Sequence, residues 1–207
     1  MGVVILGVDI YTLGDLHMNE LFKKYLDLSA VLRPQYPISL GHSADDWEKV
    51  FAKFTNDIPS IFRAIYSNVS GTMRDIEQQE LMDFIPGYRL IHICELADSK
   101  NDVERIVKSC GIKNTNTVIP LLANYSSDFI CYANFNACKN GGIYSFAHDE
   151  GEFILMCESA EKFMNTILAF YQNGVYFLDS DGYLDYDMEK ESTIGAELNH
   201  GVAYWNG

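Results

Sequence analysis

Several features that define common protein classes are missing from this chain of 207 residues. No apolar run approaches the ~20 residues of a membrane span, and the first residues, MGVVILGVDIY, lack the basic segment that opens a secretory signal peptide. The five cysteines are odd in number and form no C-x-x-C pair, and Cys94, Cys131 and Cys157 fall in apolar, strand-like patterns. These observations favour free thiols in a reducing compartment. We therefore expect a cytoplasmic protein that does not bind membranes.

Sequence motifs for nucleotide binding and catalysis are also missing. The chain contains neither the G-x-x-x-x-G-K-[ST] phosphate loop nor the G-x-G-x-x-G dinucleotide fingerprint. Ser70 precedes a glycine but lacks the glycine two positions earlier that a nucleophile elbow needs. Nothing in the sequence therefore argues for an enzyme, and we expect no cofactor.

Basic residues are scarce in the last third of the chain. The formal net charge is -14, and residues 141–207 hold 12 acids against only Lys162 and Lys190, a net charge of -10. Such a balance disfavours direct binding to nucleic acid and favours a partner with a basic surface. The alternative is a solvated acidic edge with no partner.

Two acidic clusters in this region resemble functional sites. Asp179, Asp181, Asp185 and Asp187 suggest a calcium loop, but with Gly182 as its sixth residue a methionine would take the bidentate position. Their spacing is also typical of the exposed face of a strand. His148, Asp149 and Glu150 could supply acid–base or metal-binding groups, but polar residues are expected at the turn where they lie. We therefore predict no metal site.

The apolar periodicity predicts an α+β fold with a central, largely antiparallel sheet and flanking helices. Strand patterns over residues 116–123, 128–135, 141–147 and 152–157 predict a meander. Ser159 begins a helix that we expect to cross one face of this meander. Further predicted segments are helices at 18–30, from Ser43 with Trp47, Val50, Phe51 and Phe54 inward, at 58–71 and at 101–110, strands at 3–10 and 88–94, and a last hairpin at 175–187.

Residues 33–42, RPQYPISLGH, contain two prolines and a glycine and are the best internal boundary. We therefore divide the chain into an N-terminal extension at 1–42 that packs on the same domain, a main domain at 43–187 and a C-terminal tail at 188–207. The tail is polar until Val202, after which Tyr204 and Trp205 are expected to dock back on the body.

Five segments of the chain, over about residues 43–187, resemble the SUKH superfamily of Smi/Knr-type proteins. In order they are IPSIFRAIYSNVSGT, FIPGYRLIHICEL, VIPLLANYSSDFICYANF, GGIYSFAHDE and ESAEKFMNTILAFY. Ser127 departs from the glycine usual before the aspartate in this family, and the first 40 residues have no counterpart. The resemblance implies an α+β fold without a general catalytic motif.

Many bacterial members of this superfamily are immunity proteins that bind and block a cognate toxin, and others are regulatory or scaffolding proteins. The resemblance and the acidic C-terminal third together predict a non-catalytic protein that neutralises a basic, nuclease-like toxin by occlusion; the alternative is a regulatory or scaffolding module. The residues expected to contact the partner are Asp149, Glu150, Glu152, Asp179, Asp181, Tyr183, Asp185, Tyr186 and Asp187.

Overall fold

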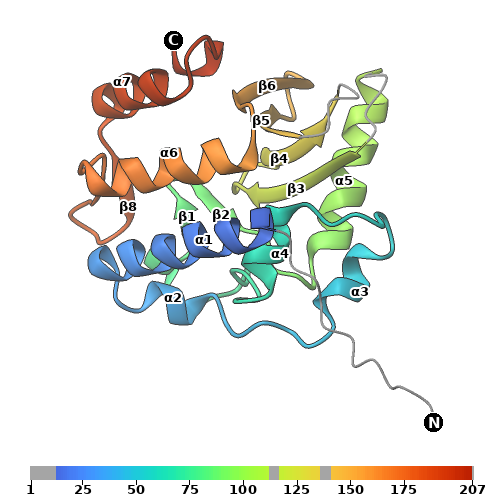
Figure 1. Cartoon of the computed structure of the whole chain (residues 1–207), viewed down its shortest axis with the longest axis horizontal. Helices are drawn as coiled ribbons and strands as arrows, with labels where there is room; N and C mark the ends of the chain where they lie inside the picture. The colour runs from blue at the N-terminus through green and yellow to red at the C-terminus, as the bar shows by residue number, and fades with distance from the viewer. Residues whose placement is uncertain (1–12, 112–116, 136–140, 207) are drawn as a thin grey trace.

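A curled, six-stranded antiparallel sheet forms the centre of the molecule, and the α+β prediction is confirmed (Figure 1). The computed structural model describes residues 13–111, 117–135 and 141–206. Neighbouring strands in the sheet follow one another in the chain. They are β1 (Asp83–Ile85), β2 (Tyr88–Leu90), β3 (Thr117–Ala123), β4 (Phe129–Asn134), β5 (Gly142–Ala147) and β6 (Glu152–Cys157).

The meander predicted between residues 116 and 157 is present from β3 onward. Ile119 pairs with Tyr132 across β3 and β4, and Phe146 pairs with Phe153 across β5 and β6. Pro120 is tolerated inside β3 because the register of the β3–β4 ladder shifts between Pro120 and Leu122. On the other side, β2 pairs only with the later part of the strand, at Leu122 and Ala123.

Seven α-helices and two 3-10 helices surround the sheet in the described part of the chain. α1 and α6 lie side by side across it, with α4 packed against α1, while α5 packs on β3 (Figure 1). Ser159 caps α6 as predicted, since its side chain accepts a hydrogen bond from the Lys162 N–H. The helices are α1 (Leu13–Leu32), α2 (Tyr36–Ser39), α3 (Trp47–Phe51), α4 (Ser60–Tyr66), α5 (Leu96–Ser109), α6 (Ala160–Gln172) and α7 (Met188–Leu198), with η1 (Gln79–Leu81) and η2 (Ala203–Trp205).

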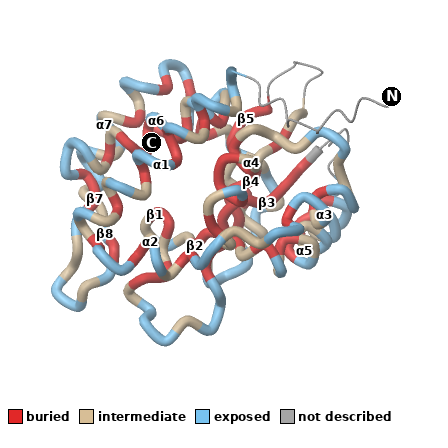
Figure 2. Tube along the Cα trace, turned by 60° about the horizontal axis from the view of Figure 1, so that its bottom comes forward, coloured by how far each residue is buried: buried red, intermediate tan, exposed pale blue. Residues whose placement is uncertain are grey.

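The core lies between the sheet and the inward sides of α1, α4 and α6, where the buried residues concentrate (Figure 2). Phe163, Ile167 and Phe170 are buried on α6, and Tyr171 is partly buried. The predicted inward face of this helix is therefore confirmed. Of the stripe predicted after Ser43, Trp47 and Phe51 are buried in the core, and Val50 and Phe54 are partly buried against it.

The C-terminal segments form a separate layer over α6 and β6. β7 (Tyr176–Leu178) and β8 (Leu184–Tyr186) make the predicted last hairpin, but as a second sheet of their own. The expected docking of the tail is confirmed, because Trp205 is buried and its Nε1–H donates to the Met156 carbonyl at 2.7 Å. Gly195 of α7 makes room for this ring, since a Cβ there would lie 2.3 Å from Trp205.

Several local predictions are wrong. Ser43 does not begin a helix: its hydroxyl donates to the Tyr66 carbonyl at 2.5 Å, and α3 starts only at Trp47. The strand expected at 88–94 ends at Leu90, so Cys94 lies at an exposed turn rather than in an apolar strand.

The segment at 33–42 holds α2, and its Tyr36 and Leu40 are fully buried. It therefore contributes to the core and is not an exposed loop. The strand expected at 3–10 lies outside the described residues.

Ser127 has a φ of +70°, the only positive value among the described non-glycine residues. This conformation favours glycine, because a Cβ is strained there. Within the described ranges, no helix is long and apolar enough to cross a membrane.

Candidate functional site

The acids expected at the β5–β6 turn are exposed, but one of them takes part in a local ion-pair network. Asp149, Glu150 and Glu152 all face solvent. His148 places Nδ1 2.8 Å from an Asp128 carboxylate oxygen and Nε2 2.8 Å from Asp149. Both ring nitrogens therefore meet carboxylates, and neither faces an open position for a substrate proton.

These contacts shift the titration of both partners. The hydrogen bond with Asp128 raises the pKa of His148 above its ordinary value, with a smaller opposing effect of desolvation. Partial burial would raise the pKa of Asp128, but hydrogen bonds from the His148 backbone and ring and from Asn124 hold it below the usual value. The ion pair between Asp128 and His148 therefore links the β3–β4 turn to the β5–β6 turn.

Two of the acids expected in the β7–β8 hairpin shape the backbone. Asp179 accepts hydrogen bonds from the N–H groups of Asp181 and Tyr183, both at 2.9 Å, and so closes the turn. Asp187 is the N-cap of α7: it accepts from the Lys190 N–H at 3.1 Å, and these contacts with Lys190 lower its pKa. Asp179 therefore stabilises the turn, and Asp187 stabilises the start of α7.

The acids of the two hairpins could converge on a common edge or face if both hairpins lay in one sheet. The structure does not meet that condition, because the 148–152 turn joins strands of the six-stranded sheet while β7 and β8 pair only with each other. Of the nine residues, Asp149, Glu150, Glu152, Asp181, Tyr183 and Asp185 are exposed. Asp179, Tyr186 and Asp187 are partly buried.

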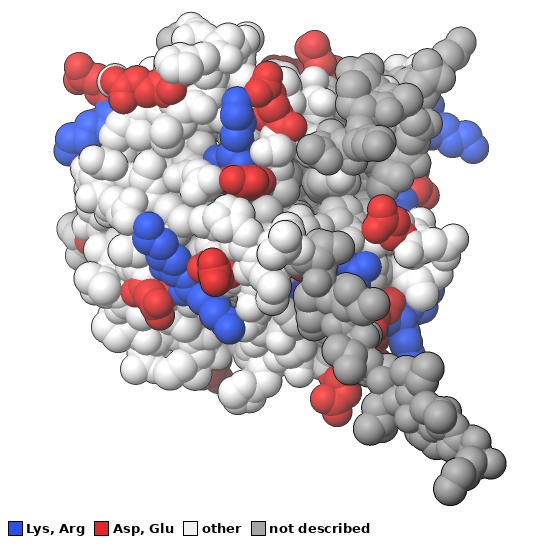
Figure 3. Space-filling model, in the orientation of Figure 1, with Lys and Arg blue, Asp and Glu red and all other residues white. Residues whose placement is uncertain are grey.

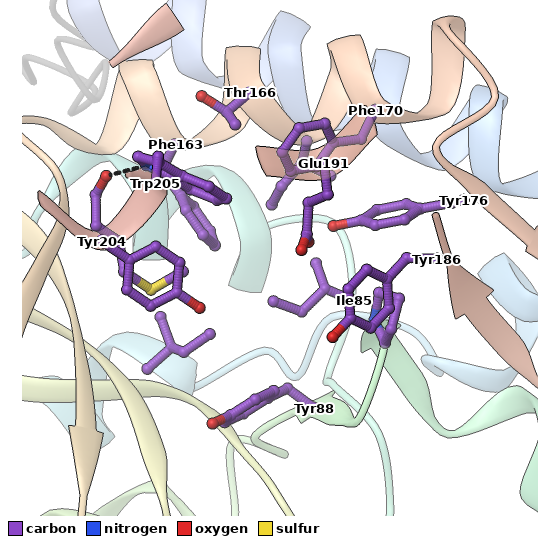
Figure 4. A pocket seen from close by; sticks show the side chains of 14 residues that line it. Ile85, Tyr88, Phe163, Thr166, Phe170, Tyr176, Tyr186, Glu191, Tyr204 and Trp205 are labelled. Carbon is purple, nitrogen blue, oxygen red and sulfur yellow. Dashed lines mark hydrogen bonds between the residues drawn. The ribbon is translucent and has the colours of Figure 1, made fainter. Parts of the chain in front are cut away.

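A cavity of about 110 Å³ lies between the sheet, α6 and the C-terminal layer, and sequence reasoning missed it. Tyr186 is the one predicted contact residue that lines it. Figure 4 shows the Glu191 carboxylate projecting into this space, with the hydroxyl end of Tyr176 directed toward it and that of Tyr204 directed into the same space. The inner wall is apolar and buried, and includes Phe163 and Phe170.

The Glu191 carboxylate dominates the electrostatics of the cavity. Burial raises the pKa of Glu191 to about 7. Burial is also the first cause of the raised pKa values of Tyr176, Tyr186 and Tyr204, and the negative charge of Glu191 adds to it in all three. The three phenols therefore lie within electrostatic reach of one carboxylate, and no ion pair involves Glu191 among the residues that the structure describes.

A second ionisable group is set among tyrosines at the end of α1. Arg33 is 3% exposed, its guanidinium lies 4.0 Å above the Tyr36 ring, and Nη2 donates to the Tyr171 hydroxyl at 3.2 Å. Tyr25 completes the group and donates its hydroxyl hydrogen to the Phe84 carbonyl at 2.8 Å. Arg33 Nε and Nη1 are buried without a hydrogen-bond partner. We call Tyr25, Arg33, Tyr36 and Tyr171 the Arg33 cluster.

Metal-binding and family comparisons add little to this geometry. No group of three or more His, Cys, Asp or Glu side chains is arranged to hold a metal ion within residues 13–111, 117–135 and 141–206. No model of a known protein family matches the chain, and comparison with curated proteins found no similar sequence.

Proposed function

We propose that this chain is a non-catalytic binding protein of the immunity type, which neutralises a toxin domain with a basic surface by occluding it. The observation that carries the proposal is the exposed acidic charge of residues 141–207. Nine of the twelve acids there are exposed and none is buried, so their charge is available to a partner. The resemblance of the chain to the SUKH superfamily supports the same reading.

The few cations in this region do not offset that charge. Lys162 is paired with Glu158 at 2.6 Å, and Lys190 is paired with Asp187 at 3.1 Å. On the face that carries α1 and α6, basic and acidic side chains are interspersed, whereas acids gather along α7 at the upper left (Figure 3). The C-terminal layer and the β5–β6 turn are therefore better candidates for the docking surface than the α1–α6 face. The free thiols of Cys94, Cys110, Cys131 and Cys157 support a reducing, cytoplasmic location.

The first experiment is co-expression of the chain with the product of the reading frame that adjoins its own gene. A stable complex together with restored cell growth is the expected result. Growth inhibition that persists, with no complex, would remove the proposal. A complex without any toxicity to relieve would favour a regulatory or scaffolding role.

Charge reversal then tests the surface. Glu150→Lys with Glu152→Lys changes the β5–β6 turn, and Asp181→Lys with Asp185→Lys changes the β7–β8 hairpin without touching the structural Asp179 and Asp187. At least one pair should slow association about tenfold at low salt and reduce its salt dependence.

The matched control for both pairs is Glu20→Lys with Glu48→Lys. It makes the same charge change at exposed positions outside residues 141–207 and should leave the rate nearly unchanged. Equal slowing by all three pairs would show a general charge effect and no defined docking surface.

A further inference from the structure

We propose that the cavity around Glu191 binds a small primary alkylammonium ion, with the ammonium group at the carboxylate and the alkyl tail on the inner apolar wall. This inference concerns a different ligand from the toxin and does not depend on the function proposed above. It rests on the composition, polarity and size of the cavity.

The polar groups that converge on the cavity match an ammonium group. Glu191 supplies a carboxylate with no cationic partner among the described residues, and Tyr176, Tyr186 and Tyr204 lie within its electrostatic reach. Their hydroxyl ends, rather than only their ring faces, are directed into the space (Figure 4). A primary ammonium has three N–H donors, which one carboxylate and two phenol oxygens can accept.

Other cations fit this set of groups less well. Calcium and magnesium need six or more oxygen ligands, and here a single carboxylate is surrounded by rings and aliphatic groups. A quaternary ammonium would leave the phenol oxygens without donors from the ligand. The donor and acceptor balance therefore favours a primary amine.

The polarity of the cavity fixes the direction in which a ligand enters. Glu191 and Tyr186 are partly exposed and Tyr204 is 40% exposed, so these three polar groups lie on the solvent side, whereas Tyr176 is buried beside them. Phe163 and Phe170 are at most 2% exposed and form the inner wall. A free amine can enter with its tail first. A lysine side chain of a partner protein would lead with its ammonium group and reach the apolar wall with the wrong end.

The volume limits the size of the ligand. A cavity of about 150 Å³ holds a benzene molecule, so about 110 Å³ accommodates roughly five non-hydrogen atoms. Butylammonium has this size and is the probe of choice. Butanol is its neutral counterpart of nearly equal shape.

The test is titration of the full chain with butylammonium, butanol, tetramethylammonium and Nα-acetyl-lysine amide, followed by calorimetry and by tryptophan fluorescence, since Trp205 lines the cavity. At about pH 8, butylammonium should bind at least tenfold more tightly than each of the other three. Its affinity should fall about tenfold between pH 8 and pH 6, as Glu191 takes up a proton. The facing groups Tyr88, Tyr176, Tyr186 and Tyr204 all have raised pKa values and remain neutral over that range.

Glu191→Gln should weaken butylammonium binding at least tenfold and abolish its pH dependence. Glu189→Gln, on the exposed side of the same helix, should change neither. If Glu191→Gln unfolds the protein, Tyr204→Phe, which removes one acceptor at the solvent side, should still weaken binding about threefold. Equal affinities for butylammonium and butanol, no binding at roughly 10 mM, or tighter binding of the lysine amide would each overturn the proposal.

Discussion

The Arg33 cluster and the Glu191 cavity are two solutions to the same physical problem, the placement of a charged side chain among tyrosines. The two regions are neighbours, because the Tyr171 ring of the first packs edge-on against Tyr176 of the second with centroids 5.1 Å apart. Arg33 is almost completely buried and its charge is accommodated by an aromatic face and a phenol oxygen. Glu191 remains partly exposed, lines the cavity and has no ion-pair partner among the described residues.

The difference shows how burial separates a structural charge from one that can serve binding. Arg33 cannot meet a ligand without opening of the core, so its contribution is limited to stability. Glu191 retains access to solvent, and the price of its partial desolvation appears as a raised pKa. A cation that entered the cavity would remove that cost.

The apolar wall behind Glu191 provides the largest expected effect. Phe170→Ala should lower the free energy of unfolding by about 3–5 kcal/mol, because the ring is buried against Tyr176 and Trp205. Urea denaturation followed by circular dichroism measures this change. The matched control is Phe177→Ala, since Phe177 is 41% exposed and should cost no more than about 0.5 kcal/mol. If Phe170→Ala lowered the free energy of unfolding as little as Phe177→Ala does, the wall would not be part of the core.

Replacement of the buried cation gives a smaller effect. Arg33→Lys keeps the charge but loses the planar contact with Tyr36 and the hydrogen bond from Nη2 to Tyr171, so we expect a loss of about 1–2 kcal/mol in the free energy of unfolding. Butylammonium binding at the Glu191 cavity should be unchanged. Arg105→Lys is the control, because the Arg105 side chain is 77% exposed. An unchanged stability for Arg33→Lys would show that the cluster does not depend on the guanidinium.

The smallest effect is on the pH dependence of stability. The pKa of Glu191 is raised from 4.5 in the unfolded reference to about 7, so the folded state holds the proton more tightly. The stability that this proton provides is complete below about pH 4.5 and is lost as the pH rises to about 7. Glu191→Gln should therefore be more stable than the parent by about 1 kcal/mol at pH 8, and nearly equal at pH 4, once partial exposure is allowed for.

The measurement is the difference in unfolding free energy between variant and parent at each pH. Glu189→Gln should show no such divergence. A Glu191→Gln difference that does not vary with pH would place the Glu191 titration at its ordinary value and weaken the contrast with Arg33.

Local sequence patterns predicted most of the fold, but they did not predict the cavity. The apolar runs that became β3 to β6 and the helical spacing of Phe163, Ile167 and Phe170 are local patterns, which a sequence records directly. The helix expected from Ser43 failed because its hydroxyl bonds a distant carbonyl, that of Tyr66. The spacing of residues in the segment after Ser43 gives no sign of a contact with a residue so far along the chain.

The cavity escaped prediction because its lining comes from segments far apart in the chain. Tyr88 lies in β2, Phe163 in α6 and Glu191 in α7. Glu191 belonged to a stretch that read as a polar tail, and only the apolar residues at Val202, Tyr204 and Trp205 signalled that this tail returns to the body. The expected acidic site fared differently, since Asp179 and Asp187 have local backbone roles that the charge pattern alone does not reveal.

The packing of Trp205 against Gly195 has a consequence for local unfolding of the protein. α7 and η2 touch the rest of the molecule mainly through α6 and β6. Two buried side-chain hydrogen bonds hold them there: the Trp205 indole donates to the Met156 carbonyl, and the Asn199 amide donates to the Thr166 hydroxyl. Such a segment can detach as a small cooperative unit while the meander stays intact. Deuterium should therefore replace the Trp205 indole hydrogen faster than the amide hydrogens of β4, and its exchange rate relative to that of an unprotected indole measures the free energy of opening of this segment.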